Sequence, residues 1–481
     1  MIKHLTLLGT ALLFSSQILL AQWKPAGDKI RTFWAEKVDV NNVLPEYPRP
    51  IMERSDWQNL NGLWNYAVLP LGQSAPTTFD GKILVPFAIE SSLSGVGKTL
   101  GMEKELWYQR AFNIPSSWRG KRVLLHFGAV DWKTEVWVNN IKVGEHTGGF
   151  TPFTFDVTEA LEKSTNTLTV KVWDPTDKGF QPRGKQVSNP RGIWYTPVSG
   201  IWQTVWLEPV NPVYIEDLMI RPDVDNSCLK MRVNTNEAFG VTVNISLLDK
   251  EGNKIATLEN DKVGRLLTIP IDNPHLWSVE DPYLYDLDIA ILKDGIQTDA
   301  VSSYCGIRKI EVKKVGETPR IFLNEKQIFQ MGPLDQGWWP DGLYTAPSDE
   351  ALLFDIKAMK ALGFNMIRKH IKIEPARWYM HCDREGILVW QDLPSPNLPS
   401  GYEDYAKKNF EDESKRIITA FRNHPSIIQW VVFNEGWGQF DTERMTQIVI
   451  SEVGQSLVCC ASGWVDAPIG DIKDSHSYPN P

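Results

Sequence analysis

A continuous apolar run that ends on a carboxylate constrains the fold more than any other feature of the chain. Residues 427–433, Ile-Ile-Gln-Trp-Val-Val-Phe, lie between Pro425 and the sequence Asn434-Glu435-Gly436. Because the run is rich in β-branched residues and does not alternate with polar ones, it predicts a short strand buried on both faces. Parallel strands of a (β/α)8 barrel end in this way, with polar groups at the carboxyl rim. The alternative is an ordinary strand-end glutamate that caps the next helix.

The last third of the chain alternates between strand-like and helix-like segments. Apolar residues recur at helical spacing in 349–362, and Gly363 ends that helix. The other expected elements are the strands 364–368, 386–392, 457–462 and 472–476 and the helices 378–384 and 409–422. This alternation predicts a parallel sheet, and polar strand ends favour a barrel. Residues 313–481 number roughly 170, whereas a whole barrel needs about 250, so we expect an incomplete (β/α)8 TIM barrel of about six strands in a C-terminally truncated chain.

The preceding part of the chain is β-rich in two blocks. From Trp57 to about residue 212, short strand patterns are followed closely by turn residues and helical periodicity is nearly absent, which predicts a jelly-roll β-sandwich. Residues 213–312 show clear alternation over a length that suits an immunoglobulin-like β-sandwich. The expected domains are therefore 22–212, 213–312 and 313–481.

Residues 1–21 have the pattern of a signal peptide. Lys3 and His4 precede a mostly apolar stretch from Leu5 to Leu20, and Ala21 is suited to cleavage. This stretch is too short for a comfortable membrane span, so we expect export to the periplasm or the cell exterior, with no membrane span after cleavage. The alternative is an uncleaved membrane anchor. The five cysteines are few, odd in number and without metal-ligand spacing, so they predict no metal site and fix no disulfide.

Charge and composition narrow the class of partner. The net charge is −9 and there is no basic block, so the chain has no electrostatic footprint for nucleic acid. The sequence also lacks a nucleotide-binding glycine loop, and we expect no cofactor. The unusual value is 20 tryptophans, whose rings pack in cores and also stack on the apolar faces of sugars. We therefore expect an oligo- or polysaccharide partner, while the sequence indicates no oligomeric state.

Motifs in all three blocks resemble those of glycoside hydrolase family 2, which contains β-galactosidases, β-glucuronidases, β-mannosidases and some arabinofuranosidases. The resemblance runs from Trp57 to Pro481. Its segments are 106–112, 136–140, 148–153 and 200–208 in the first block, 273–278, 281–285 and 306–311 in the second, and 363–368, 382–389, 422–425 and 434–435 in the third. The resemblance implies a β-galactosidase-like exo-glycosidase of carbohydrate metabolism that acts with retention of anomeric configuration.

The resemblance assigns roles to the end of the 427–433 strand. Glu435 matches the family's acid/base residue at the end of the fourth barrel strand. A water-poor pocket walled by Trp430 or Trp437 would raise the pKa of this carboxyl by desolvation. Asn434 matches the amide that bonds the sugar 2-hydroxyl, and the alternative is strand-end turn chemistry.

Three further site residues are implied by the ends of the neighbouring strands. Arg368 matches an arginine that supports the nucleophile, and the alternative is a structural ion pair at the barrel rim. His370 lies one place away from the family's usual Ser-His pair. Asp392 resembles the third-strand end of the mannosidase-like branch, although the Arg368 motif differs from that branch.

The remaining assignments concern the barrel's first and last segments. His476 and Tyr478 resemble the loop after the sixth strand, where a tyrosine usually bonds the nucleophile; the alternative is a Pro-rich surface loop. Asp335 stands where many members carry Gly-x-Asn-x-His, which puts galactose-type recognition in doubt. The family's nucleophile is a glutamate at the end of the seventh strand, which we expect beyond Pro481. The alternative function is a non-catalytic carbohydrate-binding remnant.

Overall fold

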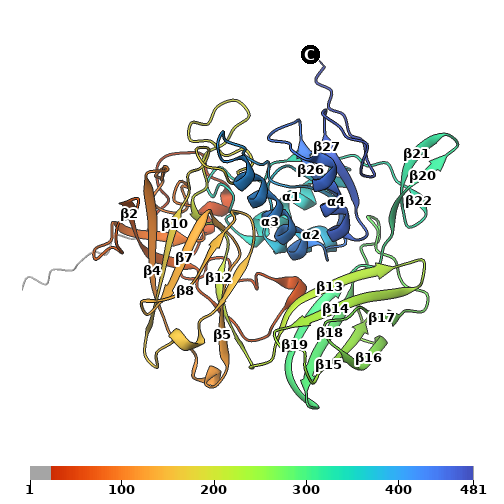
Figure 1. Cartoon of the computed structure of the whole chain (residues 1–481), viewed down its shortest axis with the longest axis horizontal. Helices are drawn as coiled ribbons and strands as arrows, with labels where there is room; N and C mark the ends of the chain where they lie inside the picture. The colour runs from red at the N-terminus through yellow and green to blue at the C-terminus, as the bar shows by residue number, and fades with distance from the viewer. Residues whose placement is uncertain (1–22, 480–481) are drawn as a thin grey trace, which may run out of the picture.

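The computed structural model describes residues 23–479 and shows three parts (Figure 1). One β-sandwich lies beside an α/β unit, and a second β-sandwich lies below that unit in the view of Figure 1. The predicted signal peptide, 1–21, lies outside the described residues. Within residues 23–479, none of the helices combines the length and apolar character that a membrane crossing requires.

The first sandwich is a jelly-roll-type domain built from two main antiparallel sheets. The orders are β1-β12-β5-β9 and β3-β2-β4-β10-β7-β8, with β11 paired to β6. Alternation explains the buried face, because Leu168, Val170 and Val172 of β10 are fully buried while the residues between them are half-buried. The strands are β1 (Gln58–Asn59), β2 (Gly62–Pro70), β3 (Gly81–Val85), β4 (Lys104–Phe112), β5 (Arg122–Phe127), β6 (Val130–Asp131), β7 (Lys133–Val138), β8 (Ile141–Thr147), β9 (Phe153–Asp156), β10 (Asn166–Trp173), β11 (Gly200–Ile201) and β12 (Val205–Val210). Short 3-10 turns are η1 (Phe33–Lys37), η2 (Pro50–Met52), η3 (Ser116–Trp118) and η4 (Thr158–Ala160).

The second sandwich is immunoglobulin-like and packs a sheet of order β13-β14-β17 against one of order β16-β15-β18-β19. A small antiparallel sheet, β20-β21-β22, follows it along the chain and protrudes at the right of Figure 1. These strands are β13 (Ile215–Asp223), β14 (Cys228–Thr235), β15 (Val241–Leu248), β16 (Lys254–Lys262), β17 (Leu267–Pro270), β18 (Tyr285–Lys293), β19 (Ile296–Cys305), β20 (Ile310–Val315), β21 (Thr318–Leu323) and β22 (Lys326–Gln327). The boundaries drawn at 212 and 312 stay predictions.

The third part is an incomplete (β/α)8 barrel with a five-stranded parallel sheet in chain order. Every residue of β26 is buried, as its continuous apolar run predicts. The strands are β23 (Leu334–Asp335), β24 (Met366–Lys369), β25 (Leu388–Asp392), β26 (Ile427–Asn434) and β27 (Leu457–Ser462). The helices are α1 (Asp349–Ala361), α2 (Ala376–Glu385), α3 (Glu403–Phe421) and α4 (Thr442–Val453).

Two sequence expectations in this part are wrong. The strand expected at 472–476 is absent, and only an isolated bridge joins Ile472 to Cys459. Asp474 and His476 instead hydrogen-bond through their side chains to Ser462, so this segment is held by side chains rather than by a backbone ladder. The helix expected from 409 begins earlier, at Glu403, because its first turn is acidic, Lys407 and Lys408 are good helix formers and Ala406 is buried.

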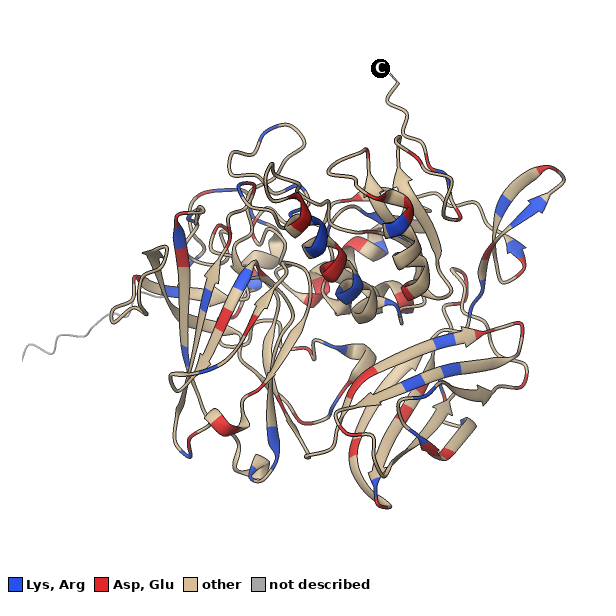
Figure 2. Cartoon of the chain, in the orientation of Figure 1, with Lys and Arg blue, Asp and Glu red and all other residues tan. Residues whose placement is uncertain are grey.

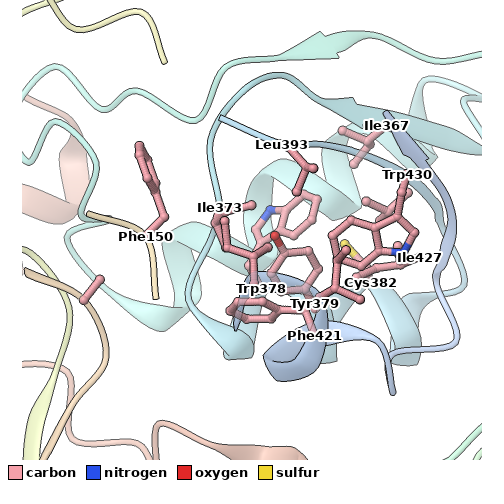
Figure 3. Close-up of a cluster of buried hydrophobic side chains, with 14 of the residues drawn as sticks. Phe150, Ile367, Ile373, Trp378, Tyr379, Cys382, Leu393, Phe421, Ile427 and Trp430 are labelled. Carbon is pink, nitrogen blue, oxygen red and sulfur yellow. The ribbon is translucent and has the colours of Figure 1, made fainter. Parts of the chain in front are cut away.

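The barrel core continues into the first sandwich. Phe150 and Trp202 of the first sandwich lie 5.9 and 5.2 Å, between ring centroids, from Tyr344 of the barrel part. Figure 3 shows Phe150 at the edge of this cluster and Trp430 and Tyr379 within it. Since the cluster is shared, the first sandwich is held in a fixed position against the barrel.

Charged side chains of both signs are spread over the surface of the described residues, and the cysteines are buried. Acidic and basic residues are interspersed over all three parts, and they alternate along α3 (Figure 2). Two of the pairs on α3 are Lys408 with Asp412 and Lys415 with Glu411. All five cysteines are buried and free.

Candidate active site

The site is built at the carboxyl ends of the parallel strands, and Glu435 stands directly after β26. Its backbone is left-handed, with φ of 53°, a conformation that is uncommon for a residue with a side chain. The Glu435 amide donates to the carbonyl of Ser462, the last residue of β27, at 2.9 Å. The turn therefore fixes Glu435 between two neighbouring strand ends.

The Glu435 carboxyl is held by the segment that follows β27. Tyr478 Oη donates to Glu435 Oε1 at 2.6 Å, and His476 Nδ1 lies 2.6 Å from the same oxygen. His476 Nε2 lies 3.1 Å from Arg368 Nη1, which is always a donor. An ionised carboxylate can only accept, so Nδ1 of His476 donates to Glu435. The structure thus brings together four of the predicted site residues.

The ionisation of Glu435 differs from the sequence expectation. Burial alone would raise the pKa of this carboxyl, but the hydrogen bonds from Tyr478 and His476 outweigh burial and hold the pKa below its ordinary value. The expectation of a pKa raised by tryptophan walls is therefore wrong for this chain.

Of the two tryptophans expected to wall the pocket, Trp430 does not reach Glu435, whereas Trp437 lies at the site. Trp430 lies five residues earlier in β26, roughly 16 Å away at about 3.3 Å per residue, so its ring cannot reach the strand end. It is fully buried in the core. Trp437 does lie at the site, with its ring 6.3 Å from His370 and 5.4 Å from Trp194.

A buried ion-pair network surrounds Asp392 at the end of β25. Arg368 Nε and Nη2 donate to both oxygens of Asp392, at 3.0 and 2.9 Å. His370 Nδ1 lies 2.7 Å from Asp392 Oδ2. Burial opposes ionisation of Asp392, yet Arg368 and His370 keep the pKa of Asp392 below its ordinary value. The guanidinium of Arg368 is thus paired with Asp392 of the same chain. This matches the alternative stated for Arg368, a structural ion pair at the barrel rim, rather than an arginine left free to support a nucleophile.

Asn434 is oriented by the same guanidinium. Arg368 Nη2 donates to Asn434 Oδ1 at 2.8 Å, which fixes the side of the amide that faces the arginine. Asn434 is buried at the last position of β26, beside Glu435. An amide held in this way is suited to bind a sugar hydroxyl.

Asp335 belongs to a separate network. Its carboxylate accepts from Lys369 Nζ at 2.7 Å and from the Gly337 amide at 2.8 Å. Lys369 also contacts Glu374 at 2.7 Å, and Glu374 in turn accepts from Lys372. The hydrogen bonds of Asp335 are therefore with Lys369 and Gly337 rather than with Glu435, and its role in substrate binding stays a prediction.

Several residues near the site were missed by the sequence analysis. Ser462 and Asp474 hydrogen-bond to each other, and Ser462 Oγ lies 2.7 Å from His476 Nε2. Lys185 and Trp194, from the segment between β10 and β11, lie against Trp437. The available signal was the run Gln181-Pro-Arg-Gly-Lys-Gln, a charged, glycine-containing loop motif.

Two cavities lie outside the immediate surroundings of Glu435, and only the first is on its side of the barrel. One of about 500 Å³ lies beside β23 and is lined by Asp335, Trp339 and Trp378 among others. Another of about 230 Å³ lies where the three parts meet. Within residues 23–479, no group of three or more His, Cys, Asp or Glu side chains is arranged to hold a metal ion.

Comparison with family models gives three matches in chain order. "Glycosyl hydrolases family 2, sugar binding domain" matches residues 97–208, "Glycosyl hydrolases family 2" matches 213–308, and "Glycosyl hydrolases family 2, TIM barrel domain" matches 320–474. Together the matches cover well over half of the chain.

Curated relatives and solved structures agree with these matches. The chain is 27% identical to a β-galactosidase of Thermoanaerobacter pseudethanolicus over 356 residues, which is 70% of this chain and 45% of the relative. It is 27% identical to a β-glucuronidase of Bacteroides fragilis over 354 residues, 68% of this chain and 49% of the relative. The chain thus spans less than half the length of these relatives. A β-glucuronidase structure from Ruminococcus gnavus shares the fold, with a TM-score of 0.73 and 22% identity over 87% of this chain and 74% of that one.

Proposed function

The chain belongs to the glycosyl hydrolases of family 2, and from that premise we propose that the complete protein hydrolyses O-glycosidic bonds of an oligo- or polysaccharide with retention of configuration. We further propose that it is exo-acting and β-galactosidase-like. The observation that carries the proposal is Glu435, a carboxyl fixed between two barrel strand ends and bonded to Tyr478 and His476.

In this proposal Glu435 moves the proton in both halves of the reaction. It protonates the oxygen of the departing group as a second carboxylate attacks the anomeric carbon and the glycosidic bond breaks. It then takes a proton from the water that displaces that carboxylate. Asn434 binds the sugar hydroxyl beside the reacting carbon, and the Asp392–Arg368 pair holds Asn434 in place.

The second carboxylate is proposed to come from a segment outside these residues, at the end of a seventh barrel strand. Retaining enzymes place their two carboxyls about 5–5.5 Å apart. A like charge at that distance disfavours ionisation of Glu435 and would raise its pKa, against the present effect of Tyr478 and His476. The segment would therefore supply the nucleophile and, by raising the pKa of Glu435, would also allow Glu435 to act as the acid.

One observation favours a second candidate, a non-catalytic carbohydrate-binding protein. In residues 23–479, two carboxylates contact the residues around Glu435: Asp392 is bonded to His370 and Asp474 is bonded to Ser462. Neither is free to attack a sugar. A protein limited to these elements would hold a glycan through Asn434 and Trp437 without cleaving it.

Substitution of Glu435 separates the two candidates. In the complete protein, Glu435→Gln should lower kcat on aryl β-glycosides by about 10²–10⁴-fold, because a general acid/base contributes about that much. Glu443→Gln, an exposed glutamate in the first turn of α4, is the control and should leave kcat unchanged. Equal rates for the parent and Glu435→Gln would refute the assignment, and no hydrolysis by the parent would favour the binding protein.

We also propose that the protein is exported to the periplasm or the cell exterior. The support is the pattern of residues 1–21, which lie outside the described part of the structure. N-terminal sequencing of the mature protein should begin after Ala21. A mature protein that retains Met1 would contradict cleavage at this position.

A further inference from the structure

We propose that Lys185, which the first sandwich contributes to the mouth of the barrel, binds an acidic substituent of the glycan, a carboxylate or a sulfate. This inference rests on the proposed function, since it names the class of substrate that the same site would take. Two observations support it: the path of the segment 174–199 across the barrel mouth, and the surroundings of the Lys185 ammonium.

The segment 174–199 connects β10 to β11 and crosses the carboxyl end of the parallel sheet. Lys185 Nζ donates to Gln336 Oε1 at 2.7 Å, just after β23. The Arg183 amide donates to the carbonyl of Ser395 at 3.3 Å, just after β25. The segment is therefore anchored to the loops in which a (β/α)8 barrel places its substrate contacts.

Two more contacts bring the segment close to the site itself. Gly184 has φ of +56°, and a Cβ built on it would lie 2.6 Å from the carbonyl oxygen of Ile371, just after β24. Only glycine allows so close a backbone approach in this conformation. Trp194 packs against Trp437, after β26, with ring centroids 5.4 Å apart. The loops after four successive strands thus contact this one segment.

The ammonium of Lys185 is buried without a matching charge. Lys185 is 6% exposed, and its hydrogen bond to Gln336 is to a neutral amide. Among residues 23–479, no carboxylate oxygen lies within 4.0 Å of Nζ, a distance that many other lysines of the chain satisfy. Burying an ammonium is costly unless it is paired, and it has three hydrogens to donate. The group is therefore short of an anionic acceptor.

The neighbouring carboxylates do not supply this acceptor. Burial lowers the pKa of Lys185, and the charges of Glu435 and Asp392 only partly oppose that effect. Glu435 is bonded to Tyr478 and His476, and Asp392 to Arg368. The ring of Trp437 lies 5.7 Å from Nζ and provides a partial, cation–π compensation.

An acidic group on the substrate fits this environment better than a hydroxyl. A carboxylate or sulfate supplies both the missing charge and several acceptor oxygens, whereas a hydroxyl supplies acceptor capacity alone. Trp437 beside the ammonium offers an apolar face for the sugar ring that carries the group. Recognition of a neutral sugar through hydroxyls is the competing outcome of the test.

Calorimetric binding to the complete protein tests the inference without relying on turnover. The titrations use the Glu435→Gln background, so that ligands are not consumed. The ligands are methyl β-glycosides of the gluco and galacto series in neutral, uronic-acid and 6-sulfated forms. We expect one acidic form to bind at least about tenfold tighter than its neutral counterpart, because a hydrogen bond between charged groups is stronger than one between neutral groups. The preferred form distinguishes a carboxylate from a sulfate.

Lys185→Met should abolish this preference, and Lys178→Met should retain it. Lys178 lies in the same segment but is exposed, with a side chain 58% accessible. The inference would be overturned if the Glu435→Gln protein, with Lys185 intact, bound acidic and neutral forms equally or bound none of them. It would also be overturned if the preference for an acidic form survived Lys185→Met. The aryl-glycoside assay is scored separately. Selective binding without hydrolysis contradicts only the proposed function, and hydrolysis without selectivity contradicts only the role of Lys185.

Discussion

A single oxygen, Oε1 of Glu435, accepts hydrogen bonds from His476 and Tyr478, which lie 41 and 43 residues later in the chain. Both bonds stabilise the charged carboxylate, so they oppose the protonated state that an acid requires. At the residue scale these bonds favour the ionised form of Glu435, which can act as a base. The negative charge of the proposed nucleophilic carboxylate would be needed to raise the pKa of Glu435 so that it can act as an acid.

At this scale Tyr478→Phe should raise the pKa of Glu435, because the substitution removes a donor to the charged form. The measurement is a 13C NMR titration of labelled glutamate carboxyls, with Glu435→Gln used to assign the resonance. Tyr402→Phe, at the N-terminus of α3 and exposed, is the control and should leave the titration unchanged. A midpoint that stays the same or falls in Tyr478→Phe would show that this hydrogen bond does not govern Glu435.

At the scale of elements, the ends of helices and strands carry most of the constraints. Both α1 and α2 are followed by a glycine with positive φ, Gly363 at +88° and Gly386 at +70°. A Cβ on Gly386 would lie 2.7 Å from the carbonyl oxygen of Val279 in the second sandwich, whereas a Cβ on Gly363 would meet nothing within 4 Å. The end of α2 is thus also a contact between domains.

The matched pair Gly363→Ala and Gly386→Ala tests this difference. The left-handed backbone alone should cost about 1–2 kcal/mol in each variant. Gly386→Ala should cost clearly more, because the alanine methyl collides with the Val279 carbonyl as well. Calorimetric unfolding compares the two variants, and equal losses would contradict the close packing of α2 on the second sandwich.

Local sequence patterns predicted the elements whose own apolar residues are buried in the core. The strand at 427–433 was confirmed because a continuous β-branched run has few other favourable states. The strand at 472–476 was wrong because its position is set by the side-chain contacts of Asp474 and His476, which no local pattern encodes. Lys185 was missed for a related reason, since only the packing of one domain on another brings it to Trp437.

At the scale of the whole molecule, a buried ionic cluster joins the first sandwich to the second. Glu208 of β12 accepts from Arg49 and Arg54, and Arg54 also contacts Asp299 of β19. Burial opposes ionisation of Glu208, but Arg49, His126 and Arg54 hold its pKa well below the ordinary value. The charge on Glu208 therefore contributes to the docking of the two sandwiches.

This cluster predicts a specific loss of stability in acid. Because the pKa of Glu208 is lower in the folded state than in the unfolded one, its contribution is fully present above the unfolded pKa and is lost as pH falls through the folded pKa. Glu208→Gln should therefore cost about 3–5 kcal/mol of unfolding free energy at pH 7 and less at pH 3. Urea unfolding at the two pH values measures the difference, with the exposed Glu103→Gln as control. A cost independent of pH would contradict this role.

The most direct test of the central claim is the dependence of Glu435→Ala on the leaving group. An acid is needed only when the departing oxygen is basic, so in the complete protein kcat/KM for a phenyl β-glycoside should fall by about 10²–10⁴-fold. For the 2,4-dinitrophenyl glycoside, whose leaving group departs without a proton, kcat/KM should change far less. Equal losses on both substrates, or a loss on neither, would show that Glu435 is not the proton donor.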